Sequence, residues 1–373
     1  MHINIVRPQM PPFAEVAEEF RRILETGMAT NNGPLVNEFE QELRRFYGCP
    51  LRPSVYCNGE LGLYHLLQAW KMRLGAGPHD SFEVLVPSFT FSGTIHALVN
   101  NNLRPVFCDV DDSLVLDLNR IQRDEASVRM VLPVGAYGNT VDLEALQGFS
   151  KANDLAVVLD NAPSFGTRFK GRHVWEYGFS EMVSFHATKI LSSMEGGCNV
   201  VTDPQLDEVL RKLRDFGQYE KQRGDVDVPG LNSKMTEVCA LVGLHNLRQA
   251  ETMLAQRAEQ ARAYNEHFGD LQRRGILQTM RVREDVHCPY LYFPLILPQD
   301  ATDFVQAMQS RGVAVRRYYT ATHQLTYYRD RYRCLDLSFT ESIKDRIVSL
   351  PLHTQMDEAT RDYLFESVRG YFL

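Results

Sequence analysis

The chain has 373 residues, enough for roughly two or three domains of about 150 residues, and 44% of them are hydrophobic, which is sufficient for large buried cores. Its net charge of −7 at pH 7 argues against a polyanion as partner, because domains that bind nucleic acid are usually basic. No apolar run reaches 18 residues, and the N-terminus lacks the charged region and long apolar stretch of a signal peptide. We therefore expect a cytoplasmic protein that binds neither nucleic acid nor membrane.

Short β-rich runs alternate with helical patterns through the first two-thirds of the chain. The predicted strands are Ser54–Cys57, Glu83–Val86, Pro105–Asp109, Met130–Val134, Ala156–Asp160, Met182–Phe185 and Cys198–Thr202. The predicted helices between them include Leu61–Leu74, Leu143–Asn153 and Gln205–Phe216. This alternation predicts crossover connections and a mostly parallel seven-stranded sheet covered by helices.

The last third of the chain changes character. After a long predicted helix, about Thr236–Phe268, which we expect to link two domains, two aromatic strand-like segments flank a helix and a final helix ends the chain. In order, these four elements are Pro289–Leu297, Thr302–Arg311, Val313–Tyr319 and Glu358–Tyr371. They predict a small α+β domain. We place the large α/β domain at residues 1–245 and the small domain at 246–373.

The seven cysteines are an odd number without C-x-x-C spacing. They are Cys49, Cys57, Cys108, Cys198, Cys239, Cys288 and Cys334. This pattern indicates reduced thiols, most of them filling the core of a cytosolic protein, and we expect no metal site.

A reactive lysine is predicted in the segment S-F-H-A-T-K-I-L-S-S-M-E-G-G, which begins at Ser184. Lys189 follows a buried-looking strand and precedes two glycines, in a stretch with few charges. A partly desolvated lysine has a lowered pKa and can attack a carbonyl at neutral pH. The alternative is a solvated loop lysine, which most lysines are.

A carboxylate upstream favours the reactive reading. Asp160 ends the apolar run A-V-V-L, and ligands of open α/β sheets bind at the carboxyl ends of strands. Alone, Asp160 could equally be a helix cap or a turn residue. Together with Lys189 it suits pyridoxal phosphate (PLP), whose chemistry needs a lysine to hold the aldehyde and an acid to keep the pyridine nitrogen protonated.

Motifs along nearly the whole chain carry a resemblance to a known family. They are T-N-N-G-P from Thr30, N-G-E-L-G-L from Asn58, P-S-F-T-F-S-G-T from Pro87, R-P-V-F-C-D-V-D from Arg104, A-Y-G-N from Ala136, the Asp160 and Lys189 segments, G-L-N-S-K-M-T-E from Gly230 and L-P-L-H from Leu350. The chain resembles the DegT-type (DegT/DnrJ/StrS) sugar aminotransferases, and looks most like members that aminate C4 of a dTDP-4-keto-6-deoxyhexose. The S-F-H-A-T-K motif followed by E-G-G is highly specific.

The resemblance implies a fold, a cofactor and partners. We expect aminotransferase fold type I, PLP as cofactor with pyridoxamine phosphate formed in the half-reaction, and L-glutamate as amino donor. The acceptor would be a nucleotide-linked keto-deoxy sugar, used for O-antigen, another glycan or a secondary metabolite. The resemblance also implies a homodimer with shared active sites.

The resemblance assigns cofactor contacts to individual residues, with two departures. Gly59, Glu60 and Ser184 match the phosphate-binding positions, but Glu60 replaces a threonine, so we expect its side chain to turn away and only its N–H to bind. Phe91 matches the ring that stacks on the pyridine, although it or Phe89 could be a core residue. The second departure is Pro163, which stands where relatives carry a donor to the phenolic oxygen of the cofactor, and proline has no such donor.

The remaining candidates concern the substrate and the dimer. Asn232 matches an asparagine that reaches toward the phosphate of the neighbouring subunit. Residues that match positions near the lysine or the sugar nucleotide are His186, Glu195, Arg316, Arg317, Tyr318, Tyr319 and His323. Each of these also has a structural reading, as a turn or surface residue.

Two rival functions remain open at the level of sequence. One is a 3-keto-sugar or cyclitol aminotransferase on the same fold, because pocket residues decide between acceptors. The other is a non-catalytic PLP-binding regulatory protein, which the departures at Glu60 and Pro163 suggest and the retained Asp160 and Lys189 oppose.

Overall fold

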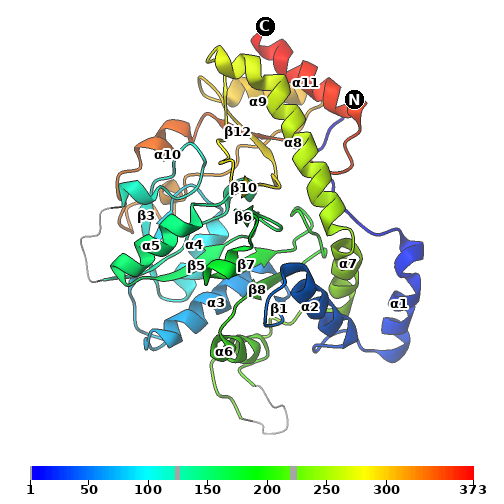
Figure 1. The fold of residues 1–373 in the computed structure, drawn as a ribbon, viewed down its shortest axis with the longest axis vertical. Helices are drawn as coiled ribbons and strands as arrows, with labels where there is room; N and C mark the ends of the chain where they lie inside the picture. The colour runs from blue at the N-terminus through cyan, green and yellow to red at the C-terminus, as the bar shows by residue number, and fades with distance from the viewer. Residues whose placement is uncertain (1, 122–126, 219–224) are drawn as a thin grey trace.

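The computed structural model describes residues 2–121, 127–218 and 225–373. Its centre is a seven-stranded sheet in the order β1-β8-β7-β5-β4-β2-β3 (Figure 1). The strands are β1 (Ser54–Tyr56), β2 (Glu83–Pro87), β3 (Arg104–Cys108), β4 (Val128–Val131), β5 (Ala156–Asp160), β7 (Ser180–Ser184) and β8 (Gly197–Val200). β8 runs antiparallel to both of its neighbours, and the other pairs are parallel. The predicted α/β class and mostly parallel sheet are confirmed.

Helices cover both faces of the sheet because its strands are apolar on both sides. Val158 of β5 packs in the core that α3 (Gly59–Arg73), α4 (Ser92–Asn100) and α6 (Pro204–Arg214) cover. Its neighbours Val157 and Leu159 face the opposite core. The helices on that side are α2 (Pro34–Tyr47), α5 (Leu143–Asn153) and α7 (Glu237–Leu247). Asp160 comes directly after these buried residues and is the last residue of β5, at the edge of the sheet where the parallel strands end.

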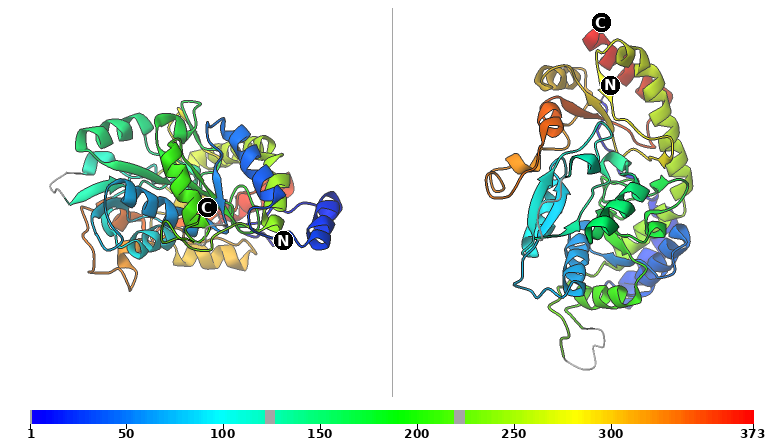
Figure 2. Two further views of the ribbon diagram at one scale, coloured as in Figure 1. Left: turned by 90° about the horizontal axis from the view of Figure 1, so that it is seen from below. Right: turned by 60° about the vertical axis from the view of Figure 1, so that its left-hand side comes forward.

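The N-terminal helix lies apart from the sheet. α1 (Phe13–Thr26) projects from the body of the molecule (Figure 2). Val16 and Ile23 pack against Leu241 of α7 in a small separate core. Phe13 on the same helix is exposed.

The single long helix predicted at Thr236–Phe268 is wrong. The structure has two helices there, α7 and α8 (Ala250–Arg273), separated at Gln249, whose backbone (φ −104°, ψ 5°) departs from helical values. α7 is held in the core, where the Asn246 side chain donates hydrogen bonds to the carbonyls of Gln9 and Ser192. α8 runs along the outside of the molecule (Figure 1), and its inner face, which includes Met253 and Tyr264, packs on the same core.

The C-terminal part forms its own three-stranded antiparallel sheet in the order β12-β11-β9. Its elements are β9 (Gln278–Thr279), β11 (Phe293–Ile296), α9 (Thr302–Ser310), β12 (Ile347–Leu350) and α11 (Glu358–Phe372). The predicted strand at Val313–Tyr319 is wrong, because that segment makes only isolated bridges at Val313 and Arg316. The domain boundary at residue 245 stays a prediction.

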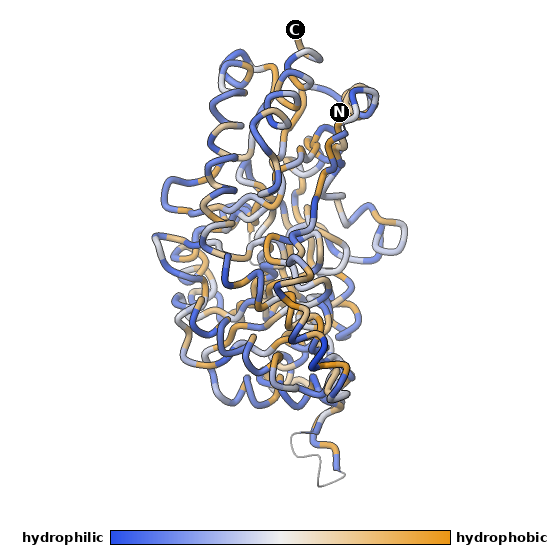
Figure 3. Tube along the Cα trace, turned by 90° about the vertical axis from the view of Figure 1, so that its right-hand side faces the viewer, coloured by the Kyte–Doolittle hydropathy of each residue, from blue (hydrophilic) through white to orange (hydrophobic). Residues whose placement is uncertain are grey.

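Smaller elements join these parts. They are β6 (Arg168–Phe169) paired with β10 (Val286–His287), and α10 (Ser338–Ile343). The outer helices alternate between hydrophilic and hydrophobic residues, as helices with one buried face do (Figure 3). Within the described residues, no helix has the length and apolar character needed to span a membrane.

Candidate active site

A cavity of about 420 Å³ lies where β5 and β7 end, bounded also by the N-termini of α3 and α4 and by the segment after α9. Most residues predicted for the site line it: Gly59, Glu60, Phe91, Asp160, Ser184, His186, Lys189, Glu195, Arg316, Tyr318 and Tyr319. Pro163 lines it too. Asn232, Arg317 and His323 do not.

Asp160 is buried and held in a fixed orientation. Its Oδ2 accepts a hydrogen bond from Thr94 Oγ1 at 2.6 Å, and its Oδ1 accepts from the Ala162 N–H at 3.0 Å. Thr94 Oγ1 also lies 3.0 Å from Thr90 Oγ1. Burial raises the pKa of Asp160 above its ordinary value, and the hydrogen bonds from Thr94 and the Ala162 N–H and the charge of Lys189 offset only part of that rise. The carboxylate is therefore well suited to a cationic partner.

Lys189 lies in a loop that main-chain hydrogen bonds hold closed. Its own N–H donates to the His186 carbonyl at 2.8 Å, and the N–H of Phe185 donates to the Gly196 carbonyl at 2.8 Å. Burial lowers the pKa of Lys189, and the negative charge of Asp160 opposes that change. A lysine with a lowered pKa has more of the neutral amine that attacks carbonyl carbon.

The N-terminus of α3 offers an anion site. Asn58 caps the helix by accepting a hydrogen bond from the Leu61 N–H at 2.8 Å, and no described residue accepts from the N–H groups of Gly59 or Glu60. A side chain at Gly59 would bring its Cβ to 2.8 Å from Cβ of Ser184, so glycine is required there. The Ser184 hydroxyl lies beside these N–H groups, and the set fits a phosphate.

Glu60 lines the same cavity, and its carboxylate lies near α4. Its Oε1 is 3.6 Å from His96 Nδ1 on α4, and both side chains are about half exposed. The structure therefore gives Glu60 a basic neighbour. That Glu60 offers only its N–H to a phosphate stays a prediction.

Two phenylalanines that the sequence could not separate lie in different surroundings. Phe89 is fully buried, whereas Phe91 lines the cavity, is 53% exposed and has its ring centroid 6.3 Å from that of Tyr318. Phe91 is thus the one with a ring face available to a ligand.

His186 and Glu195 face each other at the cavity. His186 Nε2 lies 3.4 Å from Glu195 Oε1, and His186 Nδ1 lies 2.8 Å from Thr188 Oγ1. These contacts brace the two sides of the lysine loop.

Three predicted residues lie outside the cavity with other contacts. Arg317 donates to Asp300 at 2.8 Å, and His323 lies between Ser88 Oγ (2.6 Å) and Glu341 Oε1 (2.7 Å). Asn232 is exposed and forms a main-chain bridge with Asp215.

The sequence reasoning did not single out Thr90 and Thr94, which orient Asp160. Both belong to the P-S-F-T-F-S-G-T motif, so their place in that motif was the available signal.

Comparisons with known proteins identify the family of the chain. Residues 13–369 match the DegT/DnrJ/EryC1/StrS aminotransferase family. The chain is 27% identical over 375 residues to a dTDP-4-amino-4,6-dideoxy-D-glucose transaminase of Shigella dysenteriae, with 98% of each chain covered.

Solved structures share the whole architecture. The crystal structure of DesI in the presence of its TDP-sugar product matches with a TM-score of 0.85 at 28% identity, covering 99% of this chain and 94% of that one. The sugar aminotransferase CalS13 of Micromonospora echinospora matches with a TM-score of 0.88 at 25% identity, covering 99% of both chains. The chain therefore belongs to the DegT/DnrJ/EryC1/StrS aminotransferase family and is a PLP-dependent sugar aminotransferase.

Proposed function

We propose that the enzyme transfers an amino group from L-glutamate to the keto group of a nucleotide-linked deoxy sugar, with a dTDP-4-keto-6-deoxyhexose as the favoured acceptor. The product would serve an O-antigen, another glycan or a secondary metabolite. The names of the Shigella relative and of the DesI structure support this substrate class. The observation that carries the proposal is the meeting of Lys189, Asp160 and the N-terminus of α3 around one cavity.

The residues around the cavity fit PLP. The N–H groups of Gly59 and Glu60 and the hydroxyl of Ser184 would hold its phosphate, and Phe91 would cover one ring face. Asp160 would pair with the ring nitrogen, because a carboxylate favours the protonated form of a neighbouring base. Lys189 would hold the aldehyde.

The proposed proton transfers fall to this chain's own residues. When bound, PLP supplies an electron sink for the carbon that carries the amino group. Lys189 Nζ would accept the proton from the alpha carbon of the donor and return one in the acceptor half-reaction, as a general base and acid. Its lowered pKa supports this role at neutral pH. The hydrogen bonds from Thr94 and Ala162 would favour the ionised form of Asp160, and a protonated ring nitrogen beside the carboxylate would favour it further.

Arg316 is the residue we assign to the anionic part of the substrates. Its side chain is exposed, lines the cavity and has no carboxylate partner among the described residues. A guanidinium there fits a diphosphate or a carboxylate. Arg317 and His323 are left out of the proposal, because other side chains already engage them.

We extend the proposal to a cytoplasmic homodimer with shared active sites. Asn232 is exposed and lies outside the cavity of its own chain, which supports a contact with the cofactor phosphate of a second copy.

The central test is covalent trapping. Borohydride reduction of the purified enzyme should attach the cofactor to the peptide that carries Lys189, and Lys189→Ala should lose both adduct and turnover while keeping its fold by circular dichroism. An unmodified Lys189 peptide after reduction of wild-type enzyme would overturn the assignment.

The acceptor is tested separately. Enzyme that glutamate has converted to the pyridoxamine form should be reoxidised by a dTDP-4-keto-6-deoxyhexose faster than by GDP- or UDP-linked keto sugars. Faster reoxidation by a 3-keto sugar or a cyclitol ketone would reassign the acceptor and leave the cofactor chemistry intact.

A further inference from the structure

Among the residues that line the cavity, one carries a buried hydroxyl without a hydrogen-bond partner in the described part of the chain. Tyr319 is only 3% exposed, its hydroxyl oxygen is shielded from solvent, and no described residue forms a hydrogen bond with it. Among the described residues that line the cavity, Tyr319 alone has a buried side-chain polar atom without a partner. A buried hydroxyl left unpaired costs stability, so this group points to a ligand.

The Tyr319 ring is packed so that the hydroxyl cannot swing away. Its centroid lies 4.6 Å from that of Tyr318, 5.2 Å from that of Tyr137 and 5.8 Å from that of Phe89, which meets it edge-on at 86°. The hydroxyl therefore keeps its place whether or not a ligand is present.

This inference rests on the proposed function, in which every polar group of PLP except the phenolic oxygen has a partner. The phosphate goes to the N-terminus of α3, the ring nitrogen to Asp160 and the aldehyde to Lys189. The phenolic oxygen remains, and it sits on the ring between the nitrogen and the aldehyde. Pro163 lines the cavity after Asp160 and has no side-chain donor to offer it.

We propose that the Tyr319 hydroxyl donates a hydrogen bond to the phenolic oxygen of bound PLP. Tyr319 is then a cofactor-tuning residue and not the sugar contact that its place beside Tyr318 suggests. Burial raises the pKa of the Tyr319 hydroxyl most, the neighbouring tyrosines Tyr318, Tyr137 and Tyr292 raise it further, and the charge of Asp160 adds a smaller increase. The hydroxyl therefore lies within electrostatic range of the Asp160 carboxylate.

The test is Tyr319→Phe, read by the pH dependence of the visible absorbance of the reconstituted enzyme. When PLP is bound to Lys189, the lysine nitrogen and the phenolic oxygen share one proton. A hydrogen bond donated to the phenolic oxygen stabilises the form that has lost this proton, and so lowers the pH midpoint. Without that bond, the pH midpoint should rise by about one unit. The dissociation constant for PLP, from titration of cofactor-free protein, should rise about tenfold. The melting temperature of the cofactor-free variant should not fall, because the hydroxyl has no protein partner.

Two variants serve as matched controls. Tyr137→Phe removes a buried hydroxyl beside Tyr319 that does not line the cavity, and Tyr318→Phe removes one that does. Both should keep the wild-type midpoint.

The outcomes separate the two claims. If wild-type enzyme shows no lysine-bound chromophore, the proposed function fails. If that chromophore is present and Tyr319→Phe keeps the wild-type midpoint while the KM for the sugar nucleotide rises, Tyr319 contacts the substrate and this inference alone is overturned.

Discussion

Glu60 places a negative charge in the first turn of α3, where free N–H groups favour an anion. Replacing it with threonine removes that charge and adds a hydroxyl donor. Glu60→Thr should therefore bind PLP more tightly, by at most the roughly 1.5 to 3 kcal/mol of a charge-assisted hydrogen bond. Titration of cofactor-free protein measures the change.

Glu60→Gln separates the two contributions, since it removes the charge without adding a short hydroxyl. The prediction fails if the Glu60 side chain has a structural role. Its carboxylate lies 3.6 Å from His96 Nδ1, and this contact could fix the position of the His96 side chain. Looser PLP binding in Glu60→Thr would mean that this contact holds the turn in shape and that our reading of Glu60 is wrong.

The sequence predicted that Asp160 and Lys189 lie close together, and in the structure both line one cavity. Asp160 ends β5 and Lys189 comes after β7, two neighbouring parallel strands whose carboxyl ends meet at one edge of the sheet, and the apolar runs of the sequence predict that geometry. The Thr94–Asp160 hydrogen bond joins residues 66 positions apart, so no local sequence pattern predicts it. Nor could the sequence separate Tyr318 from Tyr319, which the fold places at different depths.

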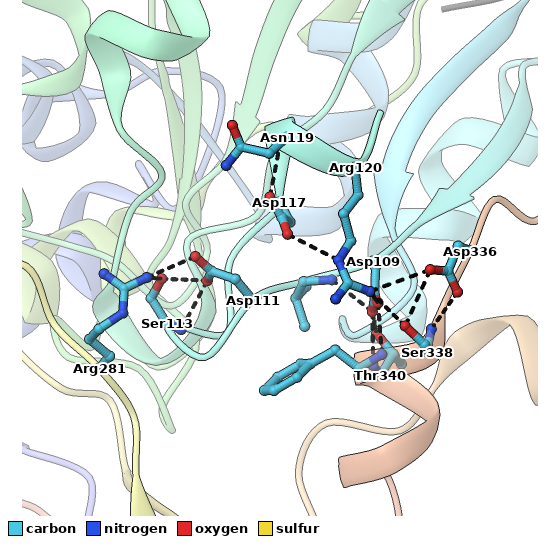
Figure 4. Close-up of polar contacts among 12 residues, drawn as sticks. Asp109, Asp111, Ser113, Asp117, Asn119, Arg120, Arg281, Asp336, Ser338 and Thr340 are labelled. Carbon is cyan, nitrogen blue, oxygen red and sulfur yellow. Dashed lines mark hydrogen bonds and ion pairs between the residues drawn. The ribbon is translucent and has the colours of Figure 1, made fainter. Parts of the chain in front are cut away.

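At the level of elements, α10 depends on a carboxylate from the end of β3. The buried Asp109 accepts hydrogen bonds from the N–H groups of Phe339 and Thr340, both at 2.8 Å, and from Thr340 Oγ1 at 2.6 Å (Figure 4). Arg120 Nη1 also reaches it at 3.0 Å. One side chain thus ties a C-terminal helix to the central sheet.

Asp109→Asn should destabilise the protein by about 1.5 to 3 kcal/mol, because a neutral amide cannot accept all of these hydrogen bonds. Urea unfolding of the cofactor-free protein measures this. Asp336→Asn is the matched control, since Asp336 reaches the same Arg120 at 3.5 Å but is 67% exposed. Asp336 also accepts a hydrogen bond from the Ser338 N–H at 3.0 Å, which the amide oxygen of asparagine can accept as well. This control variant should change stability by less than about 0.5 kcal/mol. Equal stabilities for the two variants would contradict the capping role.

The break between α7 and α8 shows where helix prediction ends. No glycine or proline stands at Arg248 or Gln249, so the composition predicts one continuous helix. The backbone departs from helical values at Gln249, and α7 before it is fixed by tertiary contacts, among them Gly243, where a Cβ would be 2.6 Å from the ring of Phe39. The strand predicted at Val313–Tyr319 failed for a similar reason, because its aromatic residues line the cavity and do not form a ladder.

At the scale of the whole molecule, a buried glutamic acid couples stability to pH. Glu181 lies on β7 and is 3% exposed, with Asn161 donating a hydrogen bond to its Oε2 at 2.6 Å. Burial raises its pKa to about 7. In the unfolded chain the pKa is near the ordinary value of 4.5. The folded protein therefore holds a proton that the unfolded chain has lost between these two pH values.

The sign of the effect follows from that difference. A raised folded-state pKa contributes stability that is fully present below pH 4.5 and is lost as pH rises toward 7. Relative to Glu181→Gln, which cannot ionise, wild-type enzyme should lose about 1.4 kcal/mol per pH unit across this window and then level off. Urea unfolding at half-unit steps from pH 4.5 to 8.5 measures the difference, and the subtraction cancels groups common to both proteins. The exposed Glu259→Gln should follow the wild-type profile throughout. A difference between wild type and Glu181→Gln that stays constant with pH would contradict the prediction. It would show that Glu181 is ionised in the folded core, although the single hydrogen bond from Asn161 is too weak to stabilise a buried charge.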